Sequence, residues 1–269
     1  MRTMPGKGRS RSGLRYLLAD IEGTLTDRSG RTSSEQLLHR LGELEAGGIL
    51  VVLASGRSVA YQQTLRARWG LDPDGPCVAE NGCCIFWEGR MYVTFDPSTY
   101  DRETIIRYLV ERGALDLGEL DPDKEFAITL YPHGFLQGAQ YSPKDIDRMY
   151  RFLKKHLKGS SYGLFYTSAS CEVLPEGVDK GTGMERLMAL GGIDPSAALF
   201  IGDGQNDIPA ARLILRGGGR VGAPANAVAA LRRIASHVSR QESHRGALEL
   251  LELYFPENDN IRRSHRPSR

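Results

Sequence analysis

The sequence predicts an α/β fold, in which a doubly wound parallel sheet carries a small inserted α+β domain. Apolar segments of strand length alternate with amphipathic helical segments at both ends of the chain. Acidic residues directly follow two of these apolar segments. Between the two ends, the alternation is replaced by a hairpin signal and a mixed pattern, which indicates an insertion.

The first part of the core is expected to cover residues 14–82. In chain order its elements are a strand at 15–20, a helix at 33–46, a strand at 49–54, a helix ending near Trp69 and a strand at 77–79. Ser34 precedes the first helix as a capping residue, and Gly47-Gly48 ends that helix. The continuously apolar strand at 49–54 is typical of a parallel strand covered on both faces.

The insertion is expected to cover residues 83–177 as an α+β domain. Glu88-Gly89-Arg90 separates two apolar segments and predicts a hairpin. The other expected elements are a helix at 101–112, a strand at 126–131, a helix at 143–157 and a strand at 164–174. Pro97 lies near one boundary of the insertion, and Pro175 lies near the other.

The second part of the core is expected to cover residues 178–255. Its elements are a helix from Lys180 to about Leu190, a strand at 198–201, a helix from Ile208, a short strand at 220–222 and a helix at 247–254. Repeated strand–helix units favour parallel strands, so both parts are expected to share one sheet.

Composition excludes several classes of protein. The longest apolar segments are of strand length, so we expect no membrane-spanning helix, and the N-terminus lacks the apolar core of a signal peptide. The four cysteines form no C-x-x-C pair, so they predict neither a zinc site nor a disulfide framework. These features together predict a cytoplasmic protein.

Both ends of the chain are polar and basic, and residues 1–13 and 256–269 are expected to be disordered. The folded part therefore carries net negative charge, although the whole chain has a formal charge of +2. Basic ends can contact nucleic-acid phosphates, but solubilising tails are the simpler interpretation, so nucleic acid is not an expected partner. The sequence leaves open whether the chain forms a homodimer.

Candidate functional residues lie where the expected strands end. Asp20 and Glu22 follow the first strand, and Asp203 and Asp207 follow the strand at 198–201. The carboxyl ends of parallel strands meet at one edge of a sheet, where open α/β folds bind ligands. Carboxylates gathered at such an edge predict a site for Mg²⁺.

Three candidates also have simpler explanations. Ser55 could cap the helix that follows it, Lys180 could be a solvated lysine in the first turn of a helix, and Asp207 could complement a helix dipole. A hydroxyl, an ammonium and carboxylates at one edge are nevertheless what phosphoryl transfer requires. A carboxylate can also be the nucleophile, through an aspartyl-phosphate intermediate.

These residues resemble the four motifs of the haloacid dehalogenase (HAD) superfamily of phosphatases. The motifs are Asp-Ile-Glu-Gly-Thr at 20–24, Ser-Gly-Arg at 55–57, Lys-Gly at 180–181 and Gly-Asp-Gly-Gln-Asn-Asp at 202–207. Glu80-Asn81-Gly82 and the insertion after it are similar to the Cof-type branch, which has a cap domain over a Rossmann-like core. Ala-Pro-Ala-Asn-Ala at 223–227 is similar to archaeal-type phosphoglycolate phosphatases.

The resemblance implies a Mg²⁺-dependent phosphomonoester hydrolase that acts through an aspartyl-phosphate. Asp20 would be the nucleophile, and Glu22 would be the general acid/base. The residues implied to bind the substrate phosphate are Ser55, Lys180 and Asn206. The residues implied to hold Mg²⁺ are Asp20, Asp203 and Asp207, with the backbone carbonyl of Glu22.

Glu22 departs from the family pattern, in which this position is usually Asp. The additional methylene moves the carboxyl group by ~1.5 Å, and a misplacement of roughly 1 Å can cost ~10²-fold in rate. A Glu here also resembles the enolase-phosphatase branch, so catalysis need not be lost. The alternatives are a sugar-phosphate phosphatase or phosphomutase of the same superfamily, and a non-catalytic binder of phosphorylated ligands.

The expected substrate is a small phosphorylated metabolite, and the resemblance implies 2-phosphoglycolate. Its carboxylate would need a cationic or N–H-rich contact beyond Lys180. The candidates for that contact are Arg57 and the basic residues Arg90, Lys124, His133, Lys144 and Arg148 of the insertion.

Overall fold

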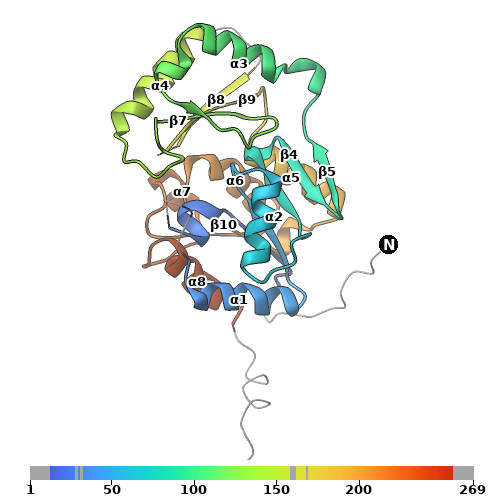
Figure 1. Cartoon of the computed structure of the whole chain (residues 1–269). Helices are drawn as coiled ribbons and strands as arrows, with labels where there is room; N and C mark the ends of the chain where they lie inside the picture. The colour runs from blue at the N-terminus through green and yellow to red at the C-terminus, as the bar shows by residue number, and fades with distance from the viewer. Residues whose placement is uncertain (1–12, 28–29, 31–32, 158–161, 168, 257–269) are drawn as a thin grey trace, which may run out of the picture.

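The computed structural model describes residues 13–27, 30, 33–157, 162–167 and 169–256. A large sheet with helices on both faces forms one part, and a smaller sheet with two helices lies above it (Figure 1). The basic ends, expected to be disordered, lie outside the described residues apart from Gly13 and Pro256.

The large sheet has eight strands in the order β12-β11-β10-β1-β2-β3-β4-β5. They are β1 (Tyr16–Ala19), β2 (Leu50–Ala54), β3 (Cys77–Ala79), β4 (Cys84–Trp87), β5 (Arg90–Val93), β10 (Ala198–Ile201), β11 (Arg220–Ala223) and β12 (His237–Val238). The strands from β12 to β3 run parallel, and β1 pairs with both β10 and β2. The carboxyl ends of these three central strands therefore lie side by side.

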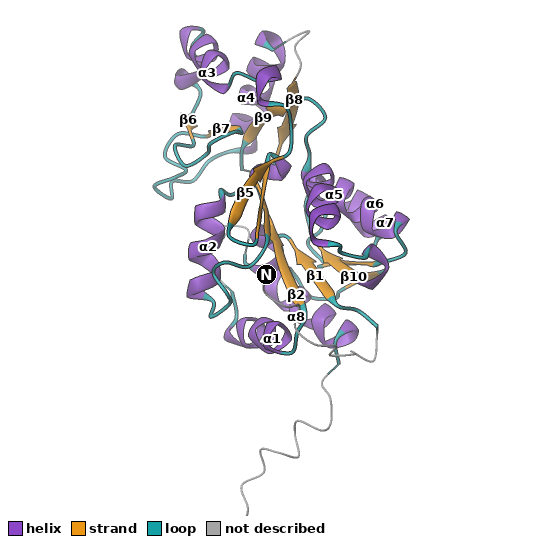
Figure 2. Cartoon of the chain, turned by 90° about the vertical axis from the view of Figure 1, so that its right-hand side faces the viewer, coloured by secondary structure: helices purple, strands orange, loops and turns teal. Residues whose placement is uncertain are grey.

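Helices cover both faces of this sheet (Figure 2). They are α1 (Glu35–Ala46), α2 (Val59–Arg68), α5 (Lys180–Gly191), α6 (Ile208–Arg216), α7 (Ala229–Ile234) and α8 (Ser243–Tyr254). Leu17 of β1 packs in a core with α1 and α8, whereas Leu18 packs in a second core with α5 and α6. Burial of both faces explains the continuously apolar strands and confirms the doubly wound α/β core.

The hairpin at Glu88-Gly89 belongs to the large sheet, although we expect it in the insertion. β4 pairs antiparallel with β3 and with β5, which makes the sheet mixed. Glu88 and Gly89 have φ angles of 48° and 75°, as a tight two-residue turn requires. Local sequence predicts such a turn, but the sheet edge that the hairpin joins depends on distant residues.

The smaller sheet has the order β6-β7-β9-β8 and, with its two helices, is called the cap below. Its elements are β6 (Glu119–Leu120), β7 (Ile128–Tyr131), β8 (Tyr162–Tyr166), β9 (Cys171–Pro175), α3 (Arg102–Glu111) and α4 (Pro143–His156). The single strand expected at 164–174 is wrong. The chain turns between β8 and β9, where the Thr167 hydroxyl accepts the backbone N–H groups of Ala169 and Ser170.

All four cysteines are buried and carry free thiols. Within the described part of the chain, no helix combines the length and the apolar character that crossing a bilayer requires.

Candidate active site

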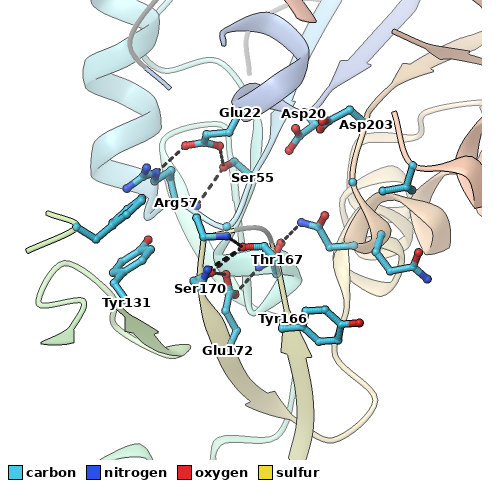
Figure 3. A pocket seen from close by; sticks show the side chains of 18 of the residues that line it. Asp20, Glu22, Ser55, Arg57, Tyr131, Tyr166, Thr167, Ser170, Glu172 and Asp203 are labelled. Carbon is cyan, nitrogen blue, oxygen red and sulfur yellow. Dashed lines mark hydrogen bonds and ion pairs between the residues drawn. The ribbon is translucent and has the colours of Figure 1, made fainter. Parts of the chain in front are cut away.

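A cavity of about 470 Å³ lies between the carboxyl edge of the large sheet and the cap. Three strands bring their terminal residues to it: Asp20 follows β1, Ser55 follows β2, and Asp203 lies two residues beyond β10. Glu22 and Asn206 also line the cavity (Figure 3). The remaining candidates, Lys180 and Asp207, are fully buried directly behind its wall.

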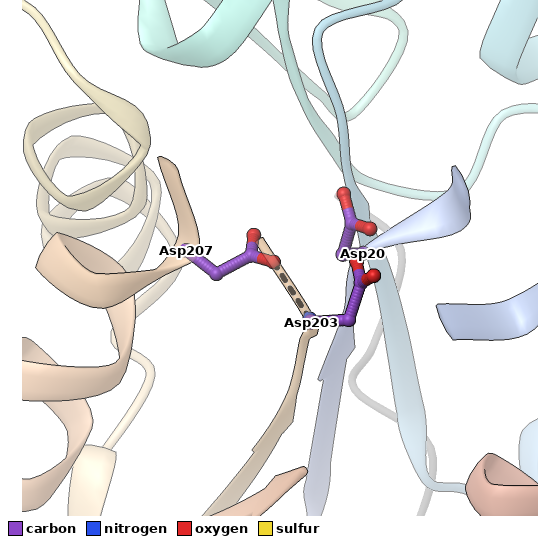
Figure 4. A group of neighbouring side chains, drawn as sticks. All are labelled: Asp20, Asp203 and Asp207. Atoms are coloured by element: carbon purple, nitrogen blue, oxygen red, sulfur yellow. Dashed lines mark hydrogen bonds between the residues drawn. The ribbon is translucent and has the colours of Figure 1, made fainter. Parts of the chain in front are cut away.

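Asp20, Asp203 and Asp207 gather at this edge (Figure 4). One carboxylate oxygen from each lies within 4.8 Å of the others. The side chain of Glu22 lies outside this group, and the role implied for its backbone carbonyl stays a prediction.

Lys180 links two of the three aspartates. Its Nζ lies 2.7 Å from Oδ1 of Asp20 and 2.5 Å from Oδ1 of Asp207. Burial lowers the pKa of Lys180, but the two carboxylates outweigh burial, so the pKa lies above its usual value. Burial, followed by the charge of Asp207, raises the pKa of Asp20 well above its usual value, despite Lys180. The alternative of a solvated lysine is therefore wrong, because Lys180 is 0% exposed.

The three aspartates differ in how their oxygens are held. Asp207 accepts the backbone N–H groups of Asp203 and Gly204 at Oδ2, so both of its oxygens are engaged. Asp203 is held at Oδ2 by the Asn226 amide, 2.9 Å away. Within the described part of the chain, Oδ2 of Asp20 accepts no hydrogen bond. Asp20 lines the cavity, so this oxygen can accept a further contact there.

Asn226 is a site residue that has no role in the sequence interpretation. Its amide donates both to Asp203 and to the backbone carbonyl of Gly23, and its oxygen accepts the N–H of Ser243. The motif Ala-Pro-Ala-Asn-Ala at 223–227 contains Asn226, but in the sequence it indicated only a resemblance to a family and no role for this residue. At Gly23, with φ of 80°, an added Cβ would lie 2.4 Å from Oδ2 of Asp203, so the close approach requires glycine.

Glu22 points toward Ser55 and Arg57. The Ser55 hydroxyl donates to Oε2 over 2.8 Å, and Nε of Arg57 donates to Oε1 over 2.6 Å. Burial raises the pKa of Glu22, but the charge of Arg57 and these hydrogen bonds outweigh burial, so the pKa lies below its usual value. The alternative that Ser55 caps α2 is wrong, because Ser58 accepts the capping N–H of Tyr61.

A chain of amide contacts joins Asn206 to the cap. The Asn206 amide donates to Oδ1 of Asn81 over 3.0 Å, and the Asn81 amide donates to Oε2 of Glu172 on β9. Lys124 is the one predicted cap cation among the residues that line the described cavity. The other predicted cap cations, absent from that lining, are Arg90, His133, Lys144 and Arg148.

Comparisons with known proteins agree with this geometry. A family model of haloacid dehalogenase-like hydrolases matches residues 17–120 and 119–251. The chain belongs to this family. A phosphoglycolate phosphatase from Aeropyrum pernix is 26% identical to this hydrolase over 244 residues, which cover 89% of this chain and 92% of the relative. The predictions of a HAD-type phosphatase and of its fold are confirmed.

A more distant relative of this hydrolase has a name that gives a different substrate. A 5-amino-6-(5-phospho-D-ribitylamino)uracil phosphatase from Escherichia coli is 23% identical and covers 89% of this chain and 95% of its own length. A solved structure from Thermoplasma acidophilum shares the fold, with a TM-score of 0.68, 21% identity and coverage of 90% and 98% of the two chains.

The three aspartates fit a divalent metal ion. Carboxylate oxygens are the donors that Mg²⁺ prefers, and Asp20, Asp203 and Asp207 bring theirs close together. Among the described residues, Lys180 pairs with Asp20 and Asp207, and Arg57 pairs with Glu22. A bound dication would add positive charge where these carboxylates gather.

Replacement of Glu22 tests its role in this hydrolase. If Glu22 is the general acid/base that the resemblance implies, Glu22→Gln should lower kcat by about 10²–10⁴-fold. Glu22→Asp should also lower kcat, because the shorter side chain cannot reach both Ser55 and Arg57. Steady-state release of phosphate from 4-nitrophenyl phosphate measures both effects, and the exposed Glu111→Gln serves as the control. An Asp variant faster than the native enzyme would show that the longer side chain is a handicap.

Proposed function

We propose that this hydrolase is a Mg²⁺-dependent phosphomonoesterase that transfers the phosphoryl group of a small metabolite to Asp20 and then to water. The observation that carries the proposal is Asp20, which lines the cavity and has its Oδ1 held by Lys180, while its Oδ2 accepts no hydrogen bond from the described residues. Orientation of this kind fixes a nucleophile for attack. Bound Mg²⁺, held by Asp20, Asp203 and Asp207, would neutralise charge on the phosphoryl oxygens.

In the first proposed step, Oδ2 of Asp20 attacks the phosphorus while the bond to the ester oxygen breaks. Glu22 donates a proton to the departing alcohol. In the second step, Glu22 accepts a proton from water as the water oxygen attacks the phosphorus, and the bond to Asp20 breaks to release inorganic phosphate. The carboxylate form of Glu22, favoured by Arg57, suits the second step. A substrate phosphate that engages Ser55 and Arg57 would weaken their contacts with Glu22. The pKa of Glu22 would then rise, which favours the protonated form that the first step requires.

Two classes of substrate are supported by different observations. The name of the Aeropyrum pernix relative supports 2-phosphoglycolate. The name of the Escherichia coli relative supports a hydroxyl-rich phosphate ester, and so does Glu172, because a cap carboxylate at the cavity favours hydrogen-bond donors over a second anion. A phosphatase transfers the phosphoryl group to water, whereas a phosphomutase transfers it to an organic acceptor. Measurement of released inorganic phosphate would therefore separate the two.

Removal of divalent metal tests the metal requirement. Dialysis against a chelator should reduce phosphate release from 4-nitrophenyl phosphate to background, and added Mg²⁺ should restore it, because Asp20, Asp203 and Asp207 bring carboxylate oxygens within 4.8 Å of one another. Asp203→Asn should raise the Mg²⁺ concentration needed for half-maximal rate. Full activity after chelation would contradict the metal assignment, and tight phosphate binding without turnover would favour the non-catalytic alternative.

A further inference from the structure

Glu172 is a buried carboxylate that the cap contributes to the cavity wall (Figure 3). It lies on β9, is 4% exposed and lines the cavity. A Cβ added to Gly56, in the loop between Ser55 and Arg57, would lie 3.4 Å from its Oε1. The carboxylate is therefore next to the loop that is expected to bind the substrate phosphate.

The partners of Glu172 are neutral. The Asn81 amide donates to Oε2, and the Ser170 hydroxyl lies 3.4 Å from Oε1. Within the described ranges, no Lys, Arg or His nitrogen lies within 4.0 Å of this carboxylate, as the ion pairs of the structure show.

Lys124 is a nearby cation, but its charge is shared. Its Nζ lies 3.0 Å from the hydroxyl of Thr129, the residue that pairs with Glu172 across β7 and β9. The same Nζ is 4.0 Å from Oδ2 of Asp121, which is also buried. Lys124 is thus engaged by Asp121 and Thr129, and among the described residues it forms no ion pair with Glu172.

A buried carboxylate without a cation of its own is costly unless donors satisfy its oxygens. Among the described residues, Oε1 of Glu172 has only the long contact with Ser170, so it can accept a further hydrogen bond from a ligand in the cavity. A hydroxyl group would supply that hydrogen bond. A second anion on the ligand would instead be repelled by Glu172 in a site shielded from water.

Resting on the proposed phosphatase activity, we propose that Glu172 selects phosphate esters whose alcohol part carries hydroxyl groups and discriminates against esters that carry a carboxylate. The preferred substrate class is a polyol or sugar phosphate. The aromatic side chains in the lining of the cavity agree with this class. Tyr131, Phe135 and Tyr166 line the cavity and provide faces for a sugar ring or carbon chain. Glu172 is thus a specificity-determining residue.

A matched pair of esters tests the inference. 2-Hydroxyethyl phosphate and 2-phosphoglycolate differ only in a hydroxymethyl group that replaces the carboxylate. The native enzyme should show at least tenfold higher kcat/KM for 2-hydroxyethyl phosphate. Glu172→Gln keeps the size of the side chain and an oxygen that can accept from Asn81. It should reduce this preference by about tenfold or more, mainly by raising kcat/KM for 2-phosphoglycolate. Glu176→Gln, an exposed carboxylate of the cap, is the control and should leave the ratio unchanged.

The outcomes separate the inference from the proposed function. A native preference for 2-phosphoglycolate would overturn the inference. An equal loss of kcat/KM on both esters in Glu172→Gln would also overturn it, because Glu172 would then act only by holding Asn81. Competition of the two esters against 4-nitrophenyl phosphate in the native enzyme gives the same ranking, even if the variant folds poorly. Failure to hydrolyse the aryl ester and both alkyl esters would overturn the proposed function itself.

Discussion

Asp20→Asn is expected to abolish turnover while the fold remains intact. An amide is a poor nucleophile, and loss of a covalent nucleophile should lower kcat by roughly 10⁴-fold or more. Asn has nearly the same shape as Asp, so the substitution should preserve the packing of this side chain between the end of β1 and Lys180. Phosphate release in a coupled assay measures the rate, and far-ultraviolet circular dichroism checks the fold.

A matched control separates the effect of Asp20 from that of charge alone. Asp147→Asn makes the same change at an exposed position on α4 and should leave kcat unaltered. Retention of more than a few per cent of native activity in Asp20→Asn would contradict its role as the nucleophile.

Lys180→Met is expected to cost both activity and stability. Methionine fills a similar volume, but it leaves Asp20 and Asp207 without the cation that joins them. Removing one partner of a buried ion pair costs about 3–5 kcal/mol of unfolding free energy. Urea unfolding followed by circular dichroism measures this loss, which should be largest in the presence of a chelator.

Mg²⁺ provides an internal check on the same variant. Because an ion that binds the folded state stabilises it, Mg²⁺ should recover part of the stability that Lys180→Met loses. Lys155→Met, on the exposed face of α4, is the control for loss of a lysine. A loss below about 1 kcal/mol in Lys180→Met would show that the buried pair contributes little to the fold.

The sequence predicts which residues lie at the carboxyl edge of the sheet, because their position depends only on where each strand ends along the chain. Asp20 and Ser55 follow apolar strands directly, and Asp203 lies two residues beyond one. Parallel strands bring their carboxyl ends together whatever the details of packing. Several helix bounds agree for the same reason, although α8 begins at Ser243 rather than at 247 and α7 has no counterpart among the expected helices. α1 begins after Ser34, whose side chain accepts the N–H of Leu37, as its capping position predicts.

Contacts between distant segments could not be predicted in this way. The pairing of Arg57 with Glu22 and the position of Glu172 at the cavity depend on how loops and cap approach the core. The division of one expected strand into β8 and β9 could not be predicted from the sequence either. Its turn at Thr167 and Ser170 is made by hydroxyl hydrogen bonds and contains no Gly or Pro that would mark it.

The most direct test of the central claim is to trap the phosphorylated enzyme. Native protein mixed with Mg²⁺ and excess 4-nitrophenyl phosphate is quenched in acid during the first turnover, and its peptides are analysed by mass spectrometry. We expect one added phosphoryl group on the peptide that contains Asp20, and none in Asp20→Asn. A phosphoryl group on any other residue, or sustained phosphate release by Asp20→Asn, would contradict transfer through Asp20.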